Sequence, residues 1–111
     1  MLDFDALNAY LDNDRDVIFA VLSTYQEDHA NALEEIQELV SQQDWGKLHF
    51  IVHTLKGILV SFGEDTATVA LENVEQNTLK NLAPQDDDLS IIYKEVEIIN
   101  KQIEDALVQY C

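Results

Sequence analysis

Residues 48–63 read LHFIVHTLKGILVSFG and carry the most informative pattern of the chain. When each residue is turned by about 100° around a helix axis, the large apolar side chains collect on one side. They are Leu48, Ile51, Leu55, Ile58, Leu59 and Phe62. The opposite side holds His49, His53, Lys56, Gly57 and Val60. The segment therefore predicts a helix that buries one face in a core and leaves His53 on the other.

Two helices are expected before this segment. Residues 3–11 predict a short helix, with Asp3 in position to cap its first turn. Residues 14–42 predict one long helix, because apolar residues recur at three- to four-residue steps. Its expected buried stripe is Val17, Val21, Tyr25, Ala32, Ile36 and Leu39, widened by Ile18, Leu22, His29 and Leu33. Asp44 can then cap the helix that contains His53.

Two more helices are expected after Gly63, which interrupts the apolar pattern. Residues 65–80 predict a helix that buries Ala67, Val69, Ala70, Leu71, Val74 and Leu79. Residues 81–88 form the clear loop, because they contain Pro84 and three aspartates. Residues 88–110 predict the last helix. Its apolar stripe is Leu89, Ile92, Val96, Ile99, Ile103, Ala106 and Tyr110.

These segments define the expected fold class. Four substantial helices with short connections pack as antiparallel neighbours. We therefore expect an all-α, up-down-up-down four-helix bundle with a short extra N-terminal helix. Residues 1–111 are expected to form a single domain, because this length is close to the commonest domain size.

Acidic side chains greatly outnumber basic ones. The chain has 22 Asp and Glu against 6 Lys and Arg, so its formal net charge is −16. Nucleic acids and anionic lipid surfaces bind positively charged proteins, so neither is an expected partner. The sequence has no basic, apolar N-terminal leader and no long apolar run. Neither a signal peptide nor a membrane span is therefore expected.

The single cysteine, Cys111, is the last residue and has no other cysteine to pair with in this sequence. The lack of a disulfide framework suits a reducing compartment, so a cytoplasmic location is expected. Met1 and the short length favour a free-standing protein over an excised module.

The run His53-Thr54-Leu55-Lys56-Gly57, with Gly63 ten residues after the histidine, resembles the signature of histidine-containing phosphotransfer (HPt) domains. The resemblance extends over essentially the whole chain, because the helix pattern and the length agree too. Further matching positions are Asp44, Trp45 and Leu48 upstream, and Ala67, Leu71, Val74 and Glu75 downstream.

The resemblance implies a phosphorelay intermediate. A phosphoryl group would arrive from the aspartate of a receiver domain, such as that of a hybrid sensor kinase, and leave to the receiver of a response regulator. The protein would be a monomeric phosphocarrier and not an enzyme, because no kinase motif is present. It would need no cofactor of its own. Magnesium for the transfer would belong to the receiver.

Three side chains would carry the chemistry. His53 would attack through Nε2, the ring nitrogen farther from the backbone, if an acceptor at Nδ1 fixes the useful tautomer. Glu75, in the family position facing the histidine, is the expected acceptor. An ordinary exposed glutamate is the alternative reading of Glu75, and Gln76 is a possible substitute. Lys56, one turn from His53, would offset the charge of the phosphoryl oxygens.

Other residues of the segment are expected to serve docking or structure. Gly57 would leave space for a receiver domain to approach the imidazole. Val60 and Phe50 would form an apolar docking patch, and His49 would modulate docking one turn before the histidine. Gly63 reads as a helix-terminating residue with a structural role.

Two other functions remain open at the level of sequence. His49 and His53 are four residues apart, so both imidazoles could bind one metal ion, although no third ligand is evident. A helical adaptor could dock on a signalling partner without carrying phosphate, but it would not need His53, Lys56 and Gly57 together. The aspartates at 86–88 are interpreted as solvated charge at a helix start and not as a cation site.

Overall fold

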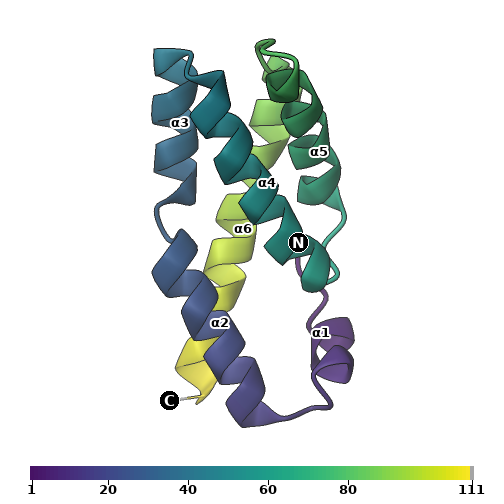
Figure 1. Cartoon of the computed structure of the whole chain (residues 1–111). Coiled ribbons are helices and arrows are strands. Elements are labelled where there is room, and N and C mark those ends of the chain that lie inside the picture. The colour runs from purple at the N-terminus through teal and green to yellow at the C-terminus, as the bar shows by residue number, and fades with distance from the viewer. Residues whose placement is uncertain (111) are drawn as a thin grey trace.

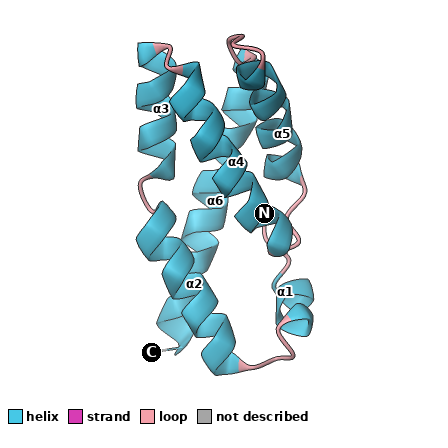
Figure 2. Ribbon diagram, viewed as in Figure 1, coloured by secondary structure: helices cyan, strands magenta, loops and turns pink. Residues whose placement is uncertain are grey.

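The structure, a computed structural model, describes residues 1–110, and within them the chain forms six helices (Figures 1 and 2). They are α1 (Phe4–Tyr10), α2 (Arg15–His29), α3 (Ala32–Gln42), α4 (Trp45–Ser61), α5 (Thr66–Leu79) and α6 (Asp86–Tyr110). The chain ascends through α2 and α3, descends through α4, ascends through α5 and descends through α6 (Figure 1). The expected all-α bundle with a short N-terminal helix is confirmed.

The prediction of one long helix over residues 14–42 is wrong in one respect. The segment is helical, but it is divided into α2 and α3. Asn31 leaves helical geometry, with φ −100° and ψ 9°, and asparagine has a low helix propensity because its side chain competes for backbone hydrogen bonds. The break lets the two halves pack on different partners. α2 packs against α6, whereas α3 packs mainly against α4.

The core side of α4 differs slightly from the expected stripe. Its buried residues are Leu48, Val52, Leu55 and Leu59. Val52 was not expected there, while Ile51 and Ile58 are only half-buried. The core therefore sits nearer the α5 side of α4 than the sequence pattern indicated.

Three residues expected in the core are exposed instead. Val17 is 41% exposed, Val69 63% and Leu79 73%. In α2 the core side belongs to Ile18, Leu22 and Tyr25. In α5 the buried face is narrow. Val69 and Leu79 lie outside this face and are exposed to solvent. That face consists of Ala67, Thr68, Ala70, Leu71, Val74 and Thr78.

The last helix begins earlier than expected, at Asp86, and takes in the three aspartates. Five of the expected core residues are buried, and Leu107 is buried where Ala106 was expected. The side chain of Tyr110 and all of Cys111 lie outside the described residues. No helix within residues 1–110 is both long and apolar enough to cross a membrane.

Side-chain caps and one turn fix the ends of α4 and α5. The side chain of Asp44 accepts from the backbone N–H of Lys47, as expected, at 3.2 Å. Gly63 has a φ of +78°, a left-handed conformation that favours glycine. The buried carboxylate of Glu64 then accepts from the N–H groups of Ala67 and Thr68. The turn and these caps set how α5 lies against α4.

Candidate functional site

His53 lies in the middle of α4, and its side chain is 62% exposed. α5 returns antiparallel to α4 after the Gly63 turn, so residues of α5 pass beside the imidazole. His53 Nδ1 is 2.7 Å from Glu75 Oε1. The structure thus brings together the two residues that the sequence analysis paired. Gln76 points elsewhere, because its amide donates to Glu72.

Glu75 contacts two residues of α4, one with each oxygen. Oε1 faces His53, and Oε2 is 2.6 Å from Lys56 Nζ. Burial raises the pKa of Glu75, but Lys56 and His53 together outweigh it and hold the pKa below its usual value. The carboxylate is therefore ionised at neutral pH and accepts hydrogen bonds without donating any.

The ionised Glu75 determines which nitrogen of the imidazole carries the proton. Since the carboxylate can only accept, Nδ1 of His53 carries a hydrogen and donates it to Oε1. In a neutral imidazole this leaves a lone pair on Nε2. Nε2 is the nitrogen farther from the backbone on an exposed side chain, so the nucleophilic atom is accessible from solvent.

Lys56 lies between two carboxylates of α5. Its Nζ is 2.6 Å from Glu72 Oε2 and 2.6 Å from Glu75 Oε2. Glu72 and then Glu75 raise the pKa of Lys56, so the ammonium is charged. The side chain is only 21% exposed. Lys56 is therefore adjacent to His53, as expected, but its charge is already paired.

Glu72 is the site residue that the sequence analysis missed. Its carboxylate contacts Lys56 and also accepts from the amide of Gln76 at 3.1 Å. Lys56 and the Gln76 amide lower the pKa of Glu72, in that order. The spacing offered a signal. Lys56 follows His53 by three residues, and Glu72 precedes Glu75 by three on the antiparallel helix.

His49 is half-buried one turn before His53 and faces the same helix. Its Nδ1 lies 3.1 Å from the Glu75 carbonyl oxygen and 3.2 Å from Thr78 Oγ1. The rings of His49 and His53 are nearly parallel, with planes 12° apart and centroids 6.3 Å apart. His49 thus contacts the backbone of Glu75, the residue whose side chain orients His53. Because Nδ1 of His49 is engaged in this way, Nε2 of His49 is the nitrogen that remains for contacts with a partner.

The geometry agrees with the comparison to known protein families, which matches residues 20–109 to the Hpt domain. The chain belongs to the Hpt domain family. Hpt domains are helical phosphocarrier modules of phosphorelays, and they work with the receiver domains of two-component systems. No curated protein and no solved structure matches the chain significantly.

Gly57 lies beside His53 on the outward side of α4 in this Hpt domain. A Cβ added at Gly57 would meet no atom within 4 Å. Packing of the bundle therefore does not require glycine here, although glycine costs a helix about 1 kcal/mol relative to alanine. The role expected for Gly57, an open approach to the imidazole, depends on this empty space.

The Gly57→Ala variant is expected to be more stable than the wild-type protein by about 1 kcal/mol, because alanine favours the helix. Its melting temperature should rise by roughly 4 to 8 °C for a domain of this size. Phosphoryl transfer from a receiver domain should nevertheless slow by roughly fivefold, since the new methyl group crowds the docked partner by about 1 kcal/mol. Thermal unfolding and single-turnover transfer measure the two effects.

Gly63→Ala is the matched control, because it makes the same chemical change where φ is +78°. This variant should lose about 1 to 2 kcal/mol of stability and keep its transfer rate while folded. A Gly57→Ala protein that transfers at the wild-type rate would contradict the role proposed for Gly57.

Four apolar side chains of α4 and α5, the two helices of the histidine site, are exposed. Phe50 is 70% exposed and Val60 57%, as expected for a docking patch. Val69 and Leu79, which were expected in the core, join them on α5. Because α4 and α5 are antiparallel, Val69 lies toward the Val60 end of the site and Leu79 toward the Phe50 end.

No metal centre accompanies these histidines in the part of the chain that the structure describes. Residues 1–110 contain no group of three or more His, Cys, Asp or Glu side chains arranged to hold an ion. Both His49 and His53 direct Nδ1 at α5. The aspartates at 86–88 form the first turn of α6, where negative charge is favoured by the helix dipole.

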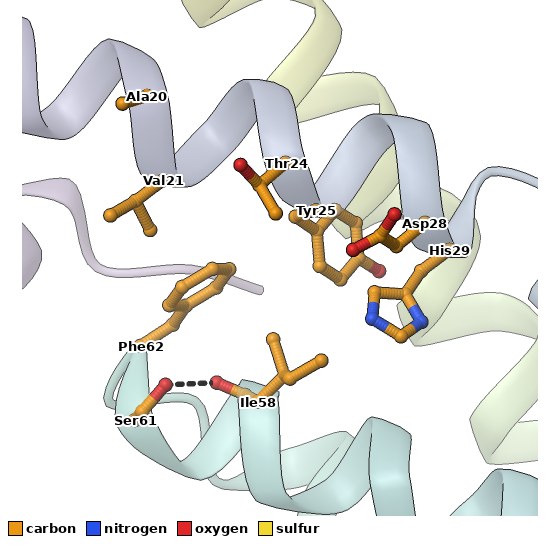
Figure 3. Close-up of a pocket in the computed structure, with 9 residues that line it drawn as sticks. All are labelled: Ala20, Val21, Thr24, Tyr25, Asp28, His29, Ile58, Ser61 and Phe62. Carbon is orange, nitrogen blue, oxygen red and sulfur yellow. Dashed lines mark hydrogen bonds between the residues drawn. The ribbon is translucent and has the colours of Figure 1, made fainter.

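A separate hollow of about 370 Å³ lies between α2 and the C-terminal half of α4 (Figure 3). Its walls include Tyr25, Ile58 and Phe62. His29, expected at the edge of the core, is half-buried, and its ring centroid is 5.4 Å from that of Tyr25. Ile58 lies on the side of α4 away from His53, so this hollow is not part of the histidine site.

Proposed function

We propose that this protein is a phosphorelay intermediate that accepts a phosphoryl group on Nε2 of His53. The donor is the phosphorylated aspartate of one receiver domain, and the acceptor is the aspartate of another. The observation that carries the proposal is the 2.7 Å contact between His53 Nδ1 and Glu75 Oε1 beside an exposed imidazole. This contact prepares one ring nitrogen for attack.

The transfer needs no proton movement on the histidine. The Nε2 lone pair of His53 forms the N–P bond while the P–O bond to the receiver aspartate breaks, and the aspartate leaves as a carboxylate. Nδ1 keeps its hydrogen throughout, and Glu75 continues to accept it. The phosphorylated ring carries a positive charge that the Glu75 carboxylate stabilises. The onward transfer to a second receiver reverses these bond changes.

Lys56 contributes by changing partners. In the free protein its ammonium is held by Glu72 and Glu75. When a phosphoryl group is bound to His53, Lys56 exchanges Glu72 for a phosphoryl oxygen while keeping Glu75. Phosphoryl transfer depends mainly on positioning and charge stabilisation, so one well-placed ammonium has a measurable effect.

The partners are receiver domains of a hybrid sensor kinase and of a response regulator, which dock in turn on the face around His53. Phe50, Val60, Val69 and Leu79 supply its apolar contacts. Magnesium enters with the receiver, and the protein acts as a cytoplasmic monomer. The test is to mix the purified protein with phosphorylated receiver domains of the source organism. Acid-labile, base-stable label on this chain is the expected result, and its absence with every receiver would contradict the proposal.

Lys56→Met is expected to raise the pKa of Glu75, because it removes a positive charge that lowers that pKa. The variant should fold, lose less than about 1 kcal/mol of stability, and transfer more slowly or hold its phosphohistidine for a shorter time. Carbon-detected NMR titration of the Glu75 carboxyl group measures the shift directly.

The stability difference between Lys56→Met and the wild type should depend on pH with a defined sign. A depressed carboxyl pKa stabilises the fold above the ordinary value of 4.5, and this contribution is lost as the pH falls through the folded pKa. The difference in the free energy of unfolding between the two proteins is therefore largest near neutral pH and disappears at acid pH. Lys101→Met, which breaks the Lys101–Asp105 pair on α6, is the control and should leave Glu75 and transfer unchanged.

A further inference from the structure

We propose that the groove between α3 and α4 is a second part of the docking surface, which takes an apolar, positively charged segment of the receiver domain. The inference rests on the proposed function and adds the kind of partner surface that this chain selects. The groove is a hollow of about 700 Å³ that opens beside Phe50, the residue that already borders the histidine site.

The groove is continuous with the face that presents His53. Phe50 lies one turn before His53 on α4, is 70% exposed, and lines the groove. Leu39 and Ile51 form apolar parts of the same hollow, the first from α3 and the second from α4. A side chain that packs on Phe50 from a receiver docked at His53 would therefore enter the groove.

Gly46 supplies an independent indication that this surface is kept open. It lies in the first turn of α4 and lines the groove. A Cβ at Gly46 would meet only Asp44 Oδ1, at 3.9 Å, which is an ordinary contact. As at Gly57, packing does not require glycine in the helix. Gly46, Phe50, His53 and Gly57 recur at three- to four-residue steps, so they form one outward stripe of α4.

The charge of the groove identifies the occupant. Glu35 and Glu38 lie exposed on α3 along one wall. Lys47 is the cation on the opposite wall, and its Nζ lies 3.9 Å from Asp44 Oδ2. Negative charge therefore exceeds positive charge around an apolar floor. A lysine or arginine whose stem packs on Phe50 would place its cationic end between the two carboxylates.

The experiment compares two charge-reversal variants with equal changes in net charge. Glu35→Lys/Glu38→Lys alters the groove, whereas Glu97→Lys/Glu104→Lys alters exposed positions of α6. The probe is a phosphorylated receiver domain that labels the wild-type protein, and the measurement is kcat/KM for labelling of His53 at low and high salt. Circular dichroism and melting temperature establish that both variants fold.

The groove variant should lose about tenfold in kcat/KM at low salt relative to the α6 variant, because association steered by charge falls by this order. The loss should shrink at high salt, where surface charges are screened. Equal rates for the two variants would overturn the groove proposal while leaving the function of His53 intact. Failure of every receiver to label the wild-type protein would instead contradict the proposed function and this inference with it.

Discussion

The His53→Gln variant is expected to accept no phosphoryl group from a phosphorylated receiver domain, although the wild-type protein is labelled. Glutamine has an amide in place of the imidazole, so it offers no nitrogen lone pair that can form an N–P bond. Its amide group can still donate to Glu75, and the side chain is exposed. The loss should therefore be chemical and not structural, with an unchanged helical spectrum and nearly unchanged stability.

His49→Gln is the matched control for this experiment. His49 stands on the same face of α4, but its Nδ1 contacts the carbonyl oxygen and not the carboxylate of Glu75. This variant should keep its phosphoryl label, and peptide mapping of the wild-type protein should place the label on His53. Label that persists in His53→Gln and disappears in His49→Gln would show that His49 is the nucleophile and would contradict the assignment to His53.

The Glu75→Ala variant should slow transfer by roughly 10- to 100-fold, the loss seen at metal sites when the hydrogen-bond partner that orients a histidine ligand is removed. Without the carboxylate, the hydrogen of His53 is shared between the two nitrogens, and the fraction with a free Nε2 falls. Lys56 also loses one of its two partners. Single-turnover kinetics measure the rate, and nitrogen NMR of the imidazole measures the tautomer populations.

Glu75→Gln distinguishes positioning from a general structural effect. The amide oxygen of glutamine can still accept from Nδ1, so much of the rate should return, while the charge next to Lys56 is lost. Both variants lose the ion pair, so they should show similar stabilities but different rates and tautomer ratios. If the glutamine variant is as slow as the alanine variant and the tautomer ratio is unchanged in both, Glu75 does not act through the imidazole.

The sequence was sufficient for the bundle and for the centre of the site. Helical spacing, Asp44 and Gly63 located α4 and its end, and the family resemblance paired His53 with Glu75. The apolar pattern failed where it is compatible with more than one buried face of the same helix. Val69 and Leu79 fit the helical spacing of the apolar residues of α5, but the buried side of that helix includes Thr68 and Thr78 and leaves both apolar residues exposed.

Pairing between helices was harder to predict than the helices themselves. Glu72 looked like one more glutamate in a chain with 22 acidic residues, and only the register of α5 against α4 selects it as a partner of Lys56. The break at Asn31 was also missed, because apolar residues continue on both sides of it. Asn31 alone was a weak signal, and only the structure shows that α2 packs against α6 whereas α3 packs mainly against α4.

The arrangement of Glu72, Lys56 and Glu75 has a consequence for how long a phosphoryl group stays. Two carboxylates and one ammonium lie beside the imidazole of His53, so these three side chains carry a net negative charge before any phosphoryl group arrives. The phosphoryl oxygens carry about −1.5 to −2 charges at neutral pH, and the positive charge of the phosphorylated ring offsets only part of this. We therefore expect phosphohistidine in this protein to have a high transfer potential and a short residence time. Such a site favours rapid onward transfer of the phosphoryl group over its accumulation on His53. The phosphorylation signal would therefore decay soon after the donor stops being phosphorylated.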